Sequence, residues 1–231
     1  MKRPRLILFD IDGTLIRTQN GFVPFNDAIL KTFGIAGDIR TVIPDGNTDP
    51  LILEEIFTAA GNPMDIPEEK WRSFADNLHD CYSQAIREGK ATVQRLPGAL
   101  ELVEALGEAQ AIYQGIVTGN LKVIAQTKLE TAGLSAYLDL GAYGSDSPHR
   151  IDLPAIAKKR WEEKTGRPIM PEQCIIVGDT PKDLAAARKN DMRCLLVGTG
   201  RYPAEELSLL QPDACLPDFT DTKLAIEILL S

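Results

Sequence analysis

The sequence lacks the features that mark several other classes of protein. Its four cysteines, at positions 81, 174, 194 and 215, are scattered and form no CxxC pair. We therefore expect neither a zinc site nor a dense disulfide framework, and we infer a reducing, cytoplasmic setting. No apolar run is long enough to cross a bilayer, and the basic start lacks the longer apolar stretch of a signal peptide.

A basic excess is also absent. The chain carries 25 lysines and arginines against 33 aspartates and glutamates, for a net charge of -8. Nonspecific nucleic-acid binding favours a basic surface, so we expect no nucleic-acid partner and no membrane partner. With 231 residues, of which 44% are hydrophobic, the chain is long enough to form a core without disulfides or a structural metal. Its composition leaves both a monomer and a homodimer open.

Short apolar runs alternate with amphipathic stretches of helical period along most of the chain. The apolar runs are typical of strands buried on both faces, at residues 6–9, 112–117, 174–177, 194–197 and, more weakly, 214–216. Helical patterns cover residues 97–106, 121–132, 153–164, 181–190 and 221–230. This alternation predicts an α/β fold with a doubly wound, mostly parallel, Rossmann-like sheet.

Residues 17–95 follow a different pattern. Helical periodicity covers 25–33, 50–60 and 68–87, and no convincing strand is visible there. Because this segment separates the first two core strands, we predict an inserted α-helical cap domain at 17–95. The catalytic α/β core then comprises 1–16 and 96–231.

Three segments that follow predicted strands carry polar side chains. The first is Asp10-Ile11-Asp12-Gly13-Thr14, in which two acids precede a glycine that permits a sharp turn. The second contains Thr118, Gly119 and Asn120 before a helix, and suits either a phosphate cradle or an ordinary helix start. The third carries Asp179 and Asp183; the latter also suits a residue that favours a helix dipole.

The combination is more specific than any single segment. The carboxyl ends of parallel strands meet at one edge of a sheet, so these acids are expected to lie together. Two carboxylates about 5 Å apart repel by about 3 kcal/mol at an effective dielectric constant of about 20. A divalent cation removes that cost, and carboxylate oxygens suit Mg²⁺.

With these motifs the chain resembles the haloacid dehalogenase superfamily of aspartate-nucleophile hydrolases. The resemblance covers the DIDGT, VTGN and GDTPKD segments and the helical insertion. Within that superfamily it most resembles the phosphoglycolate phosphatase-like branch. An acid at position 12 favours phosphate-ester chemistry, because the dehalogenases of the superfamily have no acid at that place.

The resemblance implies a role for each motif residue. Asp10 would attack phosphorus and form an aspartyl-phosphate, and Asp12 would protonate the leaving oxygen and later accept a proton from water. Mg²⁺ would be held by Asp10, Asp179 and the backbone carbonyl of Asp12, with Asp183 a ligand or a support. Thr118 and the amides near it, in Gly119 and Asn120, would bind phosphate oxygens.

The chain departs from the family at one point. The family places a lysine before the helix that leads to the third motif, whereas the region here reads SDSPHRIDLP. Arg150 is the best-placed cation and Lys158 the alternative, and a surface role for Arg150 stays open. In the insertion, the polar loop at residues 46–49 suits either a lid over the substrate or a helix cap.

These residues predict a phosphoric monoester hydrolase that acts on a small phosphorylated metabolite, phosphoglycolate or a related compound. Two alternatives stay open. The first is a phosphosugar mutase of the same superfamily, similar to β-phosphoglucomutase. The second is a phosphate-responsive regulatory protein without fast turnover, although such modules are about half this length.

Overall fold

A six-stranded parallel sheet forms the centre of the molecule. The structure, a computed structural model, describes residues 4–62, 65–138 and 140–231. The strand order is β5-β4-β1-β6-β7-β8, and the strands are β1 (Arg5–Phe9), β4 (Ile112–Val117), β5 (Gly141–Ala142), β6 (Cys174–Gly178), β7 (Arg193–Val197) and β8 (Ala214–Leu216). Five of these strands were predicted; β5, with two residues, is too short for its pattern to be visible.

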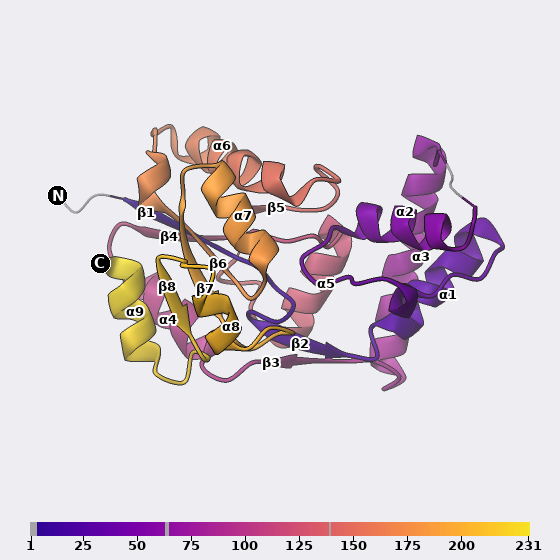
Figure 1. The fold of residues 1–231 in the computed structure, drawn as a ribbon, viewed down its shortest axis with the longest axis horizontal. Helices are drawn as coiled ribbons and strands as arrows, with labels where there is room; N and C mark the ends of the chain where they lie inside the picture. The colour runs from indigo at the N-terminus through magenta and orange to yellow at the C-terminus, as the bar shows by residue number, and fades with distance from the viewer. Residues whose placement is uncertain (1–3, 63–64, 139) are drawn as a thin grey trace.

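Helices cover both faces of the sheet (Figure 1). One face packs against α4 (Ala99–Glu108), α5 (Lys122–Ala132) and α9 (Thr222–Leu230), and the other against α6 (Leu153–Thr165), α7 (Pro181–Lys189) and α8 (Ala204–Ser208). Strand β1 serves both faces, because Ile7 and Phe9 belong to the first apolar cluster and Leu6 and Leu8 to the second. The predicted doubly wound, Rossmann-like α/β fold is therefore confirmed.

A separate group of helices, which we call the cap, follows the first strand. It consists of α1 (Phe22–Phe33), the 3-10 turn η1 (Ile39–Thr41), α2 (Asp49–Ala59) and α3 (Glu68–Arg87). Figure 1 shows α1 to α3 at one end of the molecule, away from α4, α6 and α9. Their apolar side chains form a cluster of their own, which Leu121 and Ile124 at the start of α5 complete. The domain boundaries at residues 17 and 95 stay a prediction.

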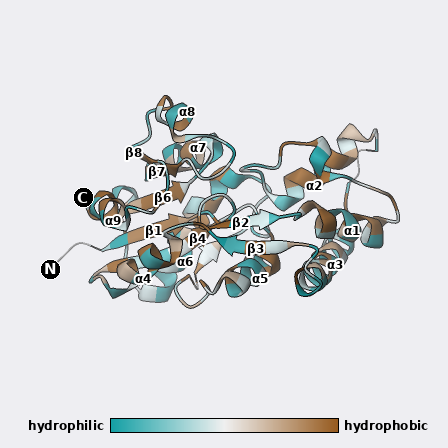
Figure 2. Ribbon diagram, turned by 90° about the horizontal axis from the view of Figure 1, so that it is seen from below, coloured by the Kyte–Doolittle hydropathy of each residue, from teal (hydrophilic) through white to brown (hydrophobic). Residues whose placement is uncertain are grey.

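A two-stranded ribbon connects the cap to the sheet. Strand β2 (Ile16–Gln19) pairs antiparallel with β3 (Thr92–Arg95), in a register that sets Ile16 opposite Arg95. The expectation of no strand between residues 17 and 95 was therefore wrong. Each strand has four residues and is half-exposed, so its pattern is weak, and its partner lies far away along the chain. Figure 2 shows this ribbon as largely hydrophilic, whereas β1 and β6 are mainly hydrophobic.

The strand order reverses direction around β1. The chain runs from β1 to β4 and β5 on one side, and then crosses to β6, β7 and β8 on the other. Ligands of open α/β sheets bind beyond the carboxyl ends of the strands at such a reversal. The end of β1, where Asp10 lies, is therefore the expected position of a site. Within the described residues, no helix is long and apolar enough to cross a membrane.

Candidate active site

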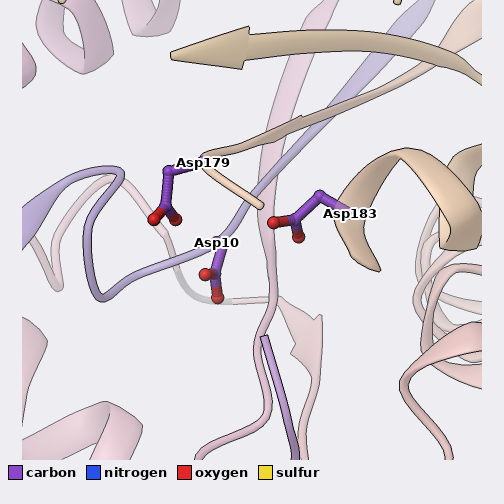
Figure 3. Close-up of side chains that lie close together, drawn as sticks. All are labelled: Asp10, Asp179 and Asp183. Carbon is purple, nitrogen blue, oxygen red and sulfur yellow. The ribbon is translucent and has the colours of Figure 1, made fainter. Parts of the chain in front are cut away.

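Three buried carboxylates converge at the carboxyl end of the sheet. Asp10 follows β1, Asp179 follows β6, and Asp183 lies in the first turn of α7. Figure 3 shows their side chains pointing toward one another. Each offers an oxygen within 4.8 Å of the others, and their residues are 5%, 2% and 0% exposed. We call Asp10, Asp179 and Asp183 the acidic cluster; the structure thus brings together three of the acids that the sequence singled out.

Local backbone structure fixes two of these acids. Asp183 caps its own helix together with Thr180: its carboxylate accepts hydrogen bonds from the Thr180 amide at 3.0 Å and the Thr180 hydroxyl at 2.7 Å. Asp179 accepts a hydrogen bond from the Thr14 hydroxyl at 3.1 Å. A Cβ atom at Gly13 or Gly200 would overlap the Asp179 carboxylate. Glycine at these two positions therefore lets the backbone approach the acid closely.

Arg150 is the cation of the acidic cluster. It lies in the 3-10 turn η2 (Arg150–Asp152) and is only 7% exposed. Its Nη2 atom lies 3.1 Å from Asp10 Oδ1, and its Nε and Nη2 atoms both donate to Asp183 Oδ1, the former at 3.1 Å. Lys158, the alternative cation, lies on α6 and pairs instead with Glu162 at 2.9 Å. Of the two, only Arg150 contacts the acidic cluster.

Two of the buried acids, Asp10 and Asp179, have strongly raised pKa values. Burial raises the pKa of Asp10 to about 6, since the Arg150 charge offsets only part of the desolvation and Asp183 adds a like charge. Burial, followed by the charges of Asp10 and Asp183, raises the pKa of Asp179 to about 9. The acidic cluster therefore holds more negative charge than its surroundings compensate.

Asp12 belongs to a different set of contacts. Its Oδ2 accepts from Lys128 Nζ at 2.7 Å and Asn120 Nδ2 at 2.8 Å, and its Oδ1 accepts from the Thr18 hydroxyl at 2.8 Å. We call Asp12, Thr18, Asn120 and Lys128 the Asp12 cluster. Burial disfavours the Asp12 charge, but the Lys128 charge and these three hydrogen bonds outweigh it and lower the pKa of Asp12. The side chain of Asp12 stays 36% exposed, whereas Lys128 is buried.

Besides Thr18, Lys128 is a site residue that our reading of the sequence missed. It lies on the buried face of α5, which also carries Ile124, Ala125, Leu129 and Ala132. A lysine on an apolar helical stripe was the available signal, because lysine is almost never buried without a partner.

The segment after β4 lies beside both clusters. The Thr118 hydroxyl is buried and accepts a hydrogen bond from Asn120 Nδ2 at 2.8 Å. The carbonyl of Gly119 accepts from the amide of Asp49 in the cap at 2.8 Å, and the Asp49 carboxylate accepts from the Leu121 amide at 2.7 Å. A Cβ at Gly119 would overlap the Asn47 carbonyl. Glycine is thus required here for the cap loop to reach the core.

The cap loop at residues 46–49 begins helix α2 and also contacts the core. Thr48 caps α2, because its side chain accepts from the Leu51 amide at 3.3 Å. The same loop contacts the core, since the Thr48 hydroxyl donates to the Pro148 carbonyl at 2.6 Å and Lys182 donates to Asn47. The helix-cap interpretation is therefore confirmed, and the role of a lid over the substrate stays a prediction.

A cavity of about 610 Å³ lies between the cap and the sheet. Asp10, Asp12, Thr118, Arg150 and Asp179 line it on the core side. Phe22, Phe25, Ile39, Val42 and Tyr82 line it on the cap side. Three arginines also line it, namely Arg17, Arg40 and Arg201. The cavity thus joins an apolar cap wall to a polar floor that includes Asp10, Asp179 and the Asp12 cluster.

Comparison with known proteins gives the family. The haloacid dehalogenase-like hydrolase family matches residues 7–188. A phosphoglycolate phosphatase of Salmonella typhimurium is 26% identical over 238 residues, which cover 94% of this chain and 90% of the Salmonella protein.

Two solved structures share the fold. A predicted phosphoglycolate phosphatase from Haemophilus somnus has a TM-score of 0.69 and 23% identity, and the match covers 98% of this chain and 99% of that one. CbbY from Rhodobacter sphaeroides, in complex with phosphate, has a TM-score of 0.65 and 17% identity over 94% of this chain and 96% of that one. The predicted enzyme class, a phosphoric monoester hydrolase, agrees with these comparisons. Because the family match spans most of its length, the chain belongs to the haloacid dehalogenase-like hydrolases.

Proposed function

We propose that this protein is a magnesium-dependent phosphatase that hydrolyses a small phosphate monoester through an aspartyl-phosphate on Asp10. The observation that carries the proposal is the convergence of Asp10, Asp179 and Asp183 with Arg150 at the floor of a cavity. A nucleophilic carboxylate, a compensating cation and a set of hard oxygen ligands meet there. These are the groups that phosphoryl transfer through a covalent enzyme intermediate needs.

In the first step an oxygen of Asp10 forms a bond to phosphorus, and the bond from phosphorus to the leaving-group oxygen breaks. Asp12, whose pKa is lowered in the free protein, must first take up a proton, and it then donates that proton to the leaving oxygen. In the second step Asp12 removes a proton from water, whose oxygen bonds to phosphorus while the bond to Asp10 breaks. The half-exposed position of Asp12 on the cavity wall supports this assignment, since both the leaving group and water must reach it.

Phosphate oxygens would be bound by Arg150 and by the segment after β4. Arg150 offers planar, charged donors 3.1 Å from Asp10, which suits phosphate. The Thr118 hydroxyl and the backbone amides of Gly119 and Asn120 are neighbouring donors on the same floor. Fixed donors of this kind stabilise the charge that develops on the phosphoryl oxygens.

The donor set of the acidic cluster fits Mg²⁺. Asp10 and Asp179 would hold the ion together with the Asp12 carbonyl, as hard oxygen ligands. Asp183 supports the site through Arg150, because its oxygens are already occupied by Thr180 and Arg150. When bound, the ion would neutralise the excess negative charge and polarise the phosphoryl group.

The cavity favours a small, anionic substrate. The cap loop contacts the core on one side of the cavity, so large phosphorylated macromolecules have little access. Three arginines line the cavity wall, and a second anionic group, such as the carboxylate of phosphoglycolate, could pair with one of them. A phosphorylated small acid is therefore the substrate class that we propose. Cytoplasmic location and a monomeric or homodimeric state stay predictions.

The test is a screen of purified protein against phosphorylated metabolites, with and without magnesium. We expect steady release of inorganic phosphate with Mg²⁺, loss of that release with EDTA, and recovery when Mg²⁺ is added back. Absence of turnover on every monophosphate, or full activity after thorough metal removal, would refute the proposal. Isomerisation of a hexose phosphate that depends on a bisphosphate would identify the mutase alternative instead.

A further inference from the structure

Lys128 is a buried cation that the proposed reaction does not yet use. It extends from the apolar face of α5 and is 4% exposed. Its Nζ atom lies 2.7 Å from Asp12 Oδ2 and 2.7 Å from Asn120 Oδ1, and 5.4 Å from the centre of the Tyr82 ring in the cap. The ammonium group therefore meets the segment after β1, the segment after β4 and a cap helix.

Stability alone does not account for a lysine at this position. Removing an ammonium group from water costs several kcal/mol, and a buried ion pair often contributes no more than well-packed apolar side chains would. The neighbours of Lys128 on this face of α5 are apolar, so leucine or methionine would suit the packing. The presence of the lysine is therefore better explained by its effect on its partner, Asp12.

The contacts of Lys128 fix the direction of the Asp12 carboxyl group. Asn120 accepts from Lys128 through Oδ1 and donates to Asp12 Oδ2 through Nδ2, so the carboxamide is oriented by both neighbours. Lys128 and Asn120 thus bind the same oxygen of Asp12, while Thr18 binds the other. With both oxygens held, the Asp12 carboxyl group cannot rotate freely.

We propose that Lys128 is a positioning residue that directs Asp12 at the leaving-group oxygen. The inference rests on the proposed function and deepens it by separating two duties. Arg150 serves the phosphoryl group and Asp10, whereas Lys128 serves the proton transfer that accompanies cleavage of the leaving-group bond. When Asp12 gives its proton to the leaving oxygen, the carboxylate that remains is already paired with the Lys128 ammonium.

Two aryl phosphates of similar shape test this inference. Phenyl phosphate needs a proton on its leaving oxygen more than 4-nitrophenyl phosphate does, because nitrophenolate is the weaker base. The quantity to compare is kcat/KM, since it reports the steps up to release of the first product and not the shared hydrolysis of the aspartyl-phosphate. The variants are Lys128→Met and Lys128→Arg, with Lys122→Met as the control from an exposed position on the same helix.

In Lys128→Met we expect kcat/KM to fall by about 100-fold for phenyl phosphate and by about 5-fold or less for 4-nitrophenyl phosphate. Lys128→Arg keeps the charge and should recover at least about a tenth of the lost activity on phenyl phosphate, and Lys122→Met should resemble the wild type. Equal losses on both substrates in Lys128→Met and in Lys128→Arg would overturn the positioning role, as would unchanged activity on phenyl phosphate. If the wild type hydrolyses neither these compounds nor any phosphorylated metabolite of the screen, the proposed function itself fails, and the two failures are thus distinguishable.

Discussion

The acidic cluster and the Asp12 cluster lie on one cavity floor but differ in charge balance. The acidic cluster sets three carboxylates against one guanidinium group. The Asp12 cluster sets one carboxylate against one ammonium group and completes its hydrogen bonds with Asn120 and Thr18. The first therefore has an excess of negative charge that protonation or a bound cation can neutralise, whereas the second is neutral as it stands.

The shifted pKa values of the two clusters move in opposite directions, because the negative charge is compensated in only one of them. Burial raises the pKa values of Asp10 and Asp179, because their charges are not fully compensated. The pKa of Asp12 is lowered, because Lys128 and two neutral donors outweigh its burial. The comparison teaches that an excess of acids, rather than their burial alone, distinguishes a metal site from a closed polar network.

The largest effect is expected from Asp10→Asn, which removes the proposed nucleophile from the acidic cluster. We expect turnover of 4-nitrophenyl phosphate with Mg²⁺ to fall by about 10⁴-fold or more, because the amide cannot form the aspartyl-phosphate. The far-UV circular dichroism spectrum should stay that of the wild type. Asp80→Asn, at an exposed position in the cap, is the matched control. Activity within about tenfold of the wild type would refute the assignment of Asp10 as nucleophile.

The next effect concerns the cation of the acidic cluster. Arg150→Ala removes the donors next to Asp10 and should lower kcat/KM by about 10²- to 10³-fold. Lys158→Ala should change kcat/KM by less than about twofold, because that lysine pairs only with Glu162. Steady-state kinetics on one aryl phosphate measures both. Equal, mild losses in the two variants would mean that Arg150 is not the phosphate-binding cation.

A smaller effect, on stability, should come from the Asp12 cluster. Asp12→Asn removes the carboxylate that pairs with the buried Lys128 ammonium and leaves Asp49 as a more distant acid. Breaking a buried pair costs about 3–5 kcal/mol, but Asp12 is partly exposed, so we expect a loss of about 1–3 kcal/mol after screening. Urea denaturation gives the free energy of unfolding. A variant as stable as the wild type would show that the ion pair of Asp12 and Lys128 contributes nothing to the free energy of unfolding.

The smallest effect should have the opposite sign and comes from the acidic cluster. With a pKa of about 9, Asp179 is mostly protonated in the folded protein at pH 8 but ionised in the unfolded chain, so folding requires the uptake of a proton that Asp179→Asn does not need. At pH 8 the free energy of unfolding of the metal-free variant should therefore exceed that of the wild type by about 1 kcal/mol or more. The same substitution should reduce the stabilisation by Mg²⁺, which for the wild type reaches about 2.7 kcal/mol at 100 times the dissociation constant. Thermal unfolding with EDTA and with Mg²⁺ measures both quantities.

The dependence of stability on pH follows from the raised pKa of Asp179. The pKa of Asp179 is about 9 in the folded protein and 3.8 in the unfolded chain. Its contribution to stability is therefore full below pH 4 and is lost as the pH rises to about 9. Between pH 6 and 9 the metal-free wild type should lose stability, and Asp179→Asn should lose less. Equal slopes for the two proteins would contradict the charge excess that we assign to the acidic cluster.

Much of the fold could be predicted from the sequence because its main signals are local. Buried strands such as 112–117 are short apolar runs, and helix ends such as Gly133, with a φ of 68°, follow from glycine's tolerance of the left-handed conformation. The ribbon of β2 and β3 could not be predicted in this way. Its residues form strands because of a partner more than 70 positions away, and such pairings leave little trace in composition.

The candidate site was predictable to the extent that its residues follow strands. Asp10, Thr118 and Asp179 all lie at strand ends, where topology brings them together. Lys128 lies in the middle of a helix, and its distance from Asp12 depends on how α5 packs on the sheet. Arg150 was identified by its place before a helix, but its contacts with two acids depend on the turn that η2 forms. Contacts of this kind depend on how the elements pack, and the spacing of residues along the chain does not predict them.

Helix α5 contributes to two apolar clusters at once, and this has a consequence for substrate entry. Ala125, Leu129 and Ala132 pack in the cluster of the sheet, while Leu121 and Ile124 pack among the aromatic residues of the cap. Moving the cap away from α5 would expose those two side chains to water. The hydrophobic effect therefore opposes this motion. The same helix carries Lys128, so an opened cap would also withdraw Tyr82 from the ammonium group. An opening of the cap would thus also change the surroundings of Lys128, the residue that we propose to orient Asp12.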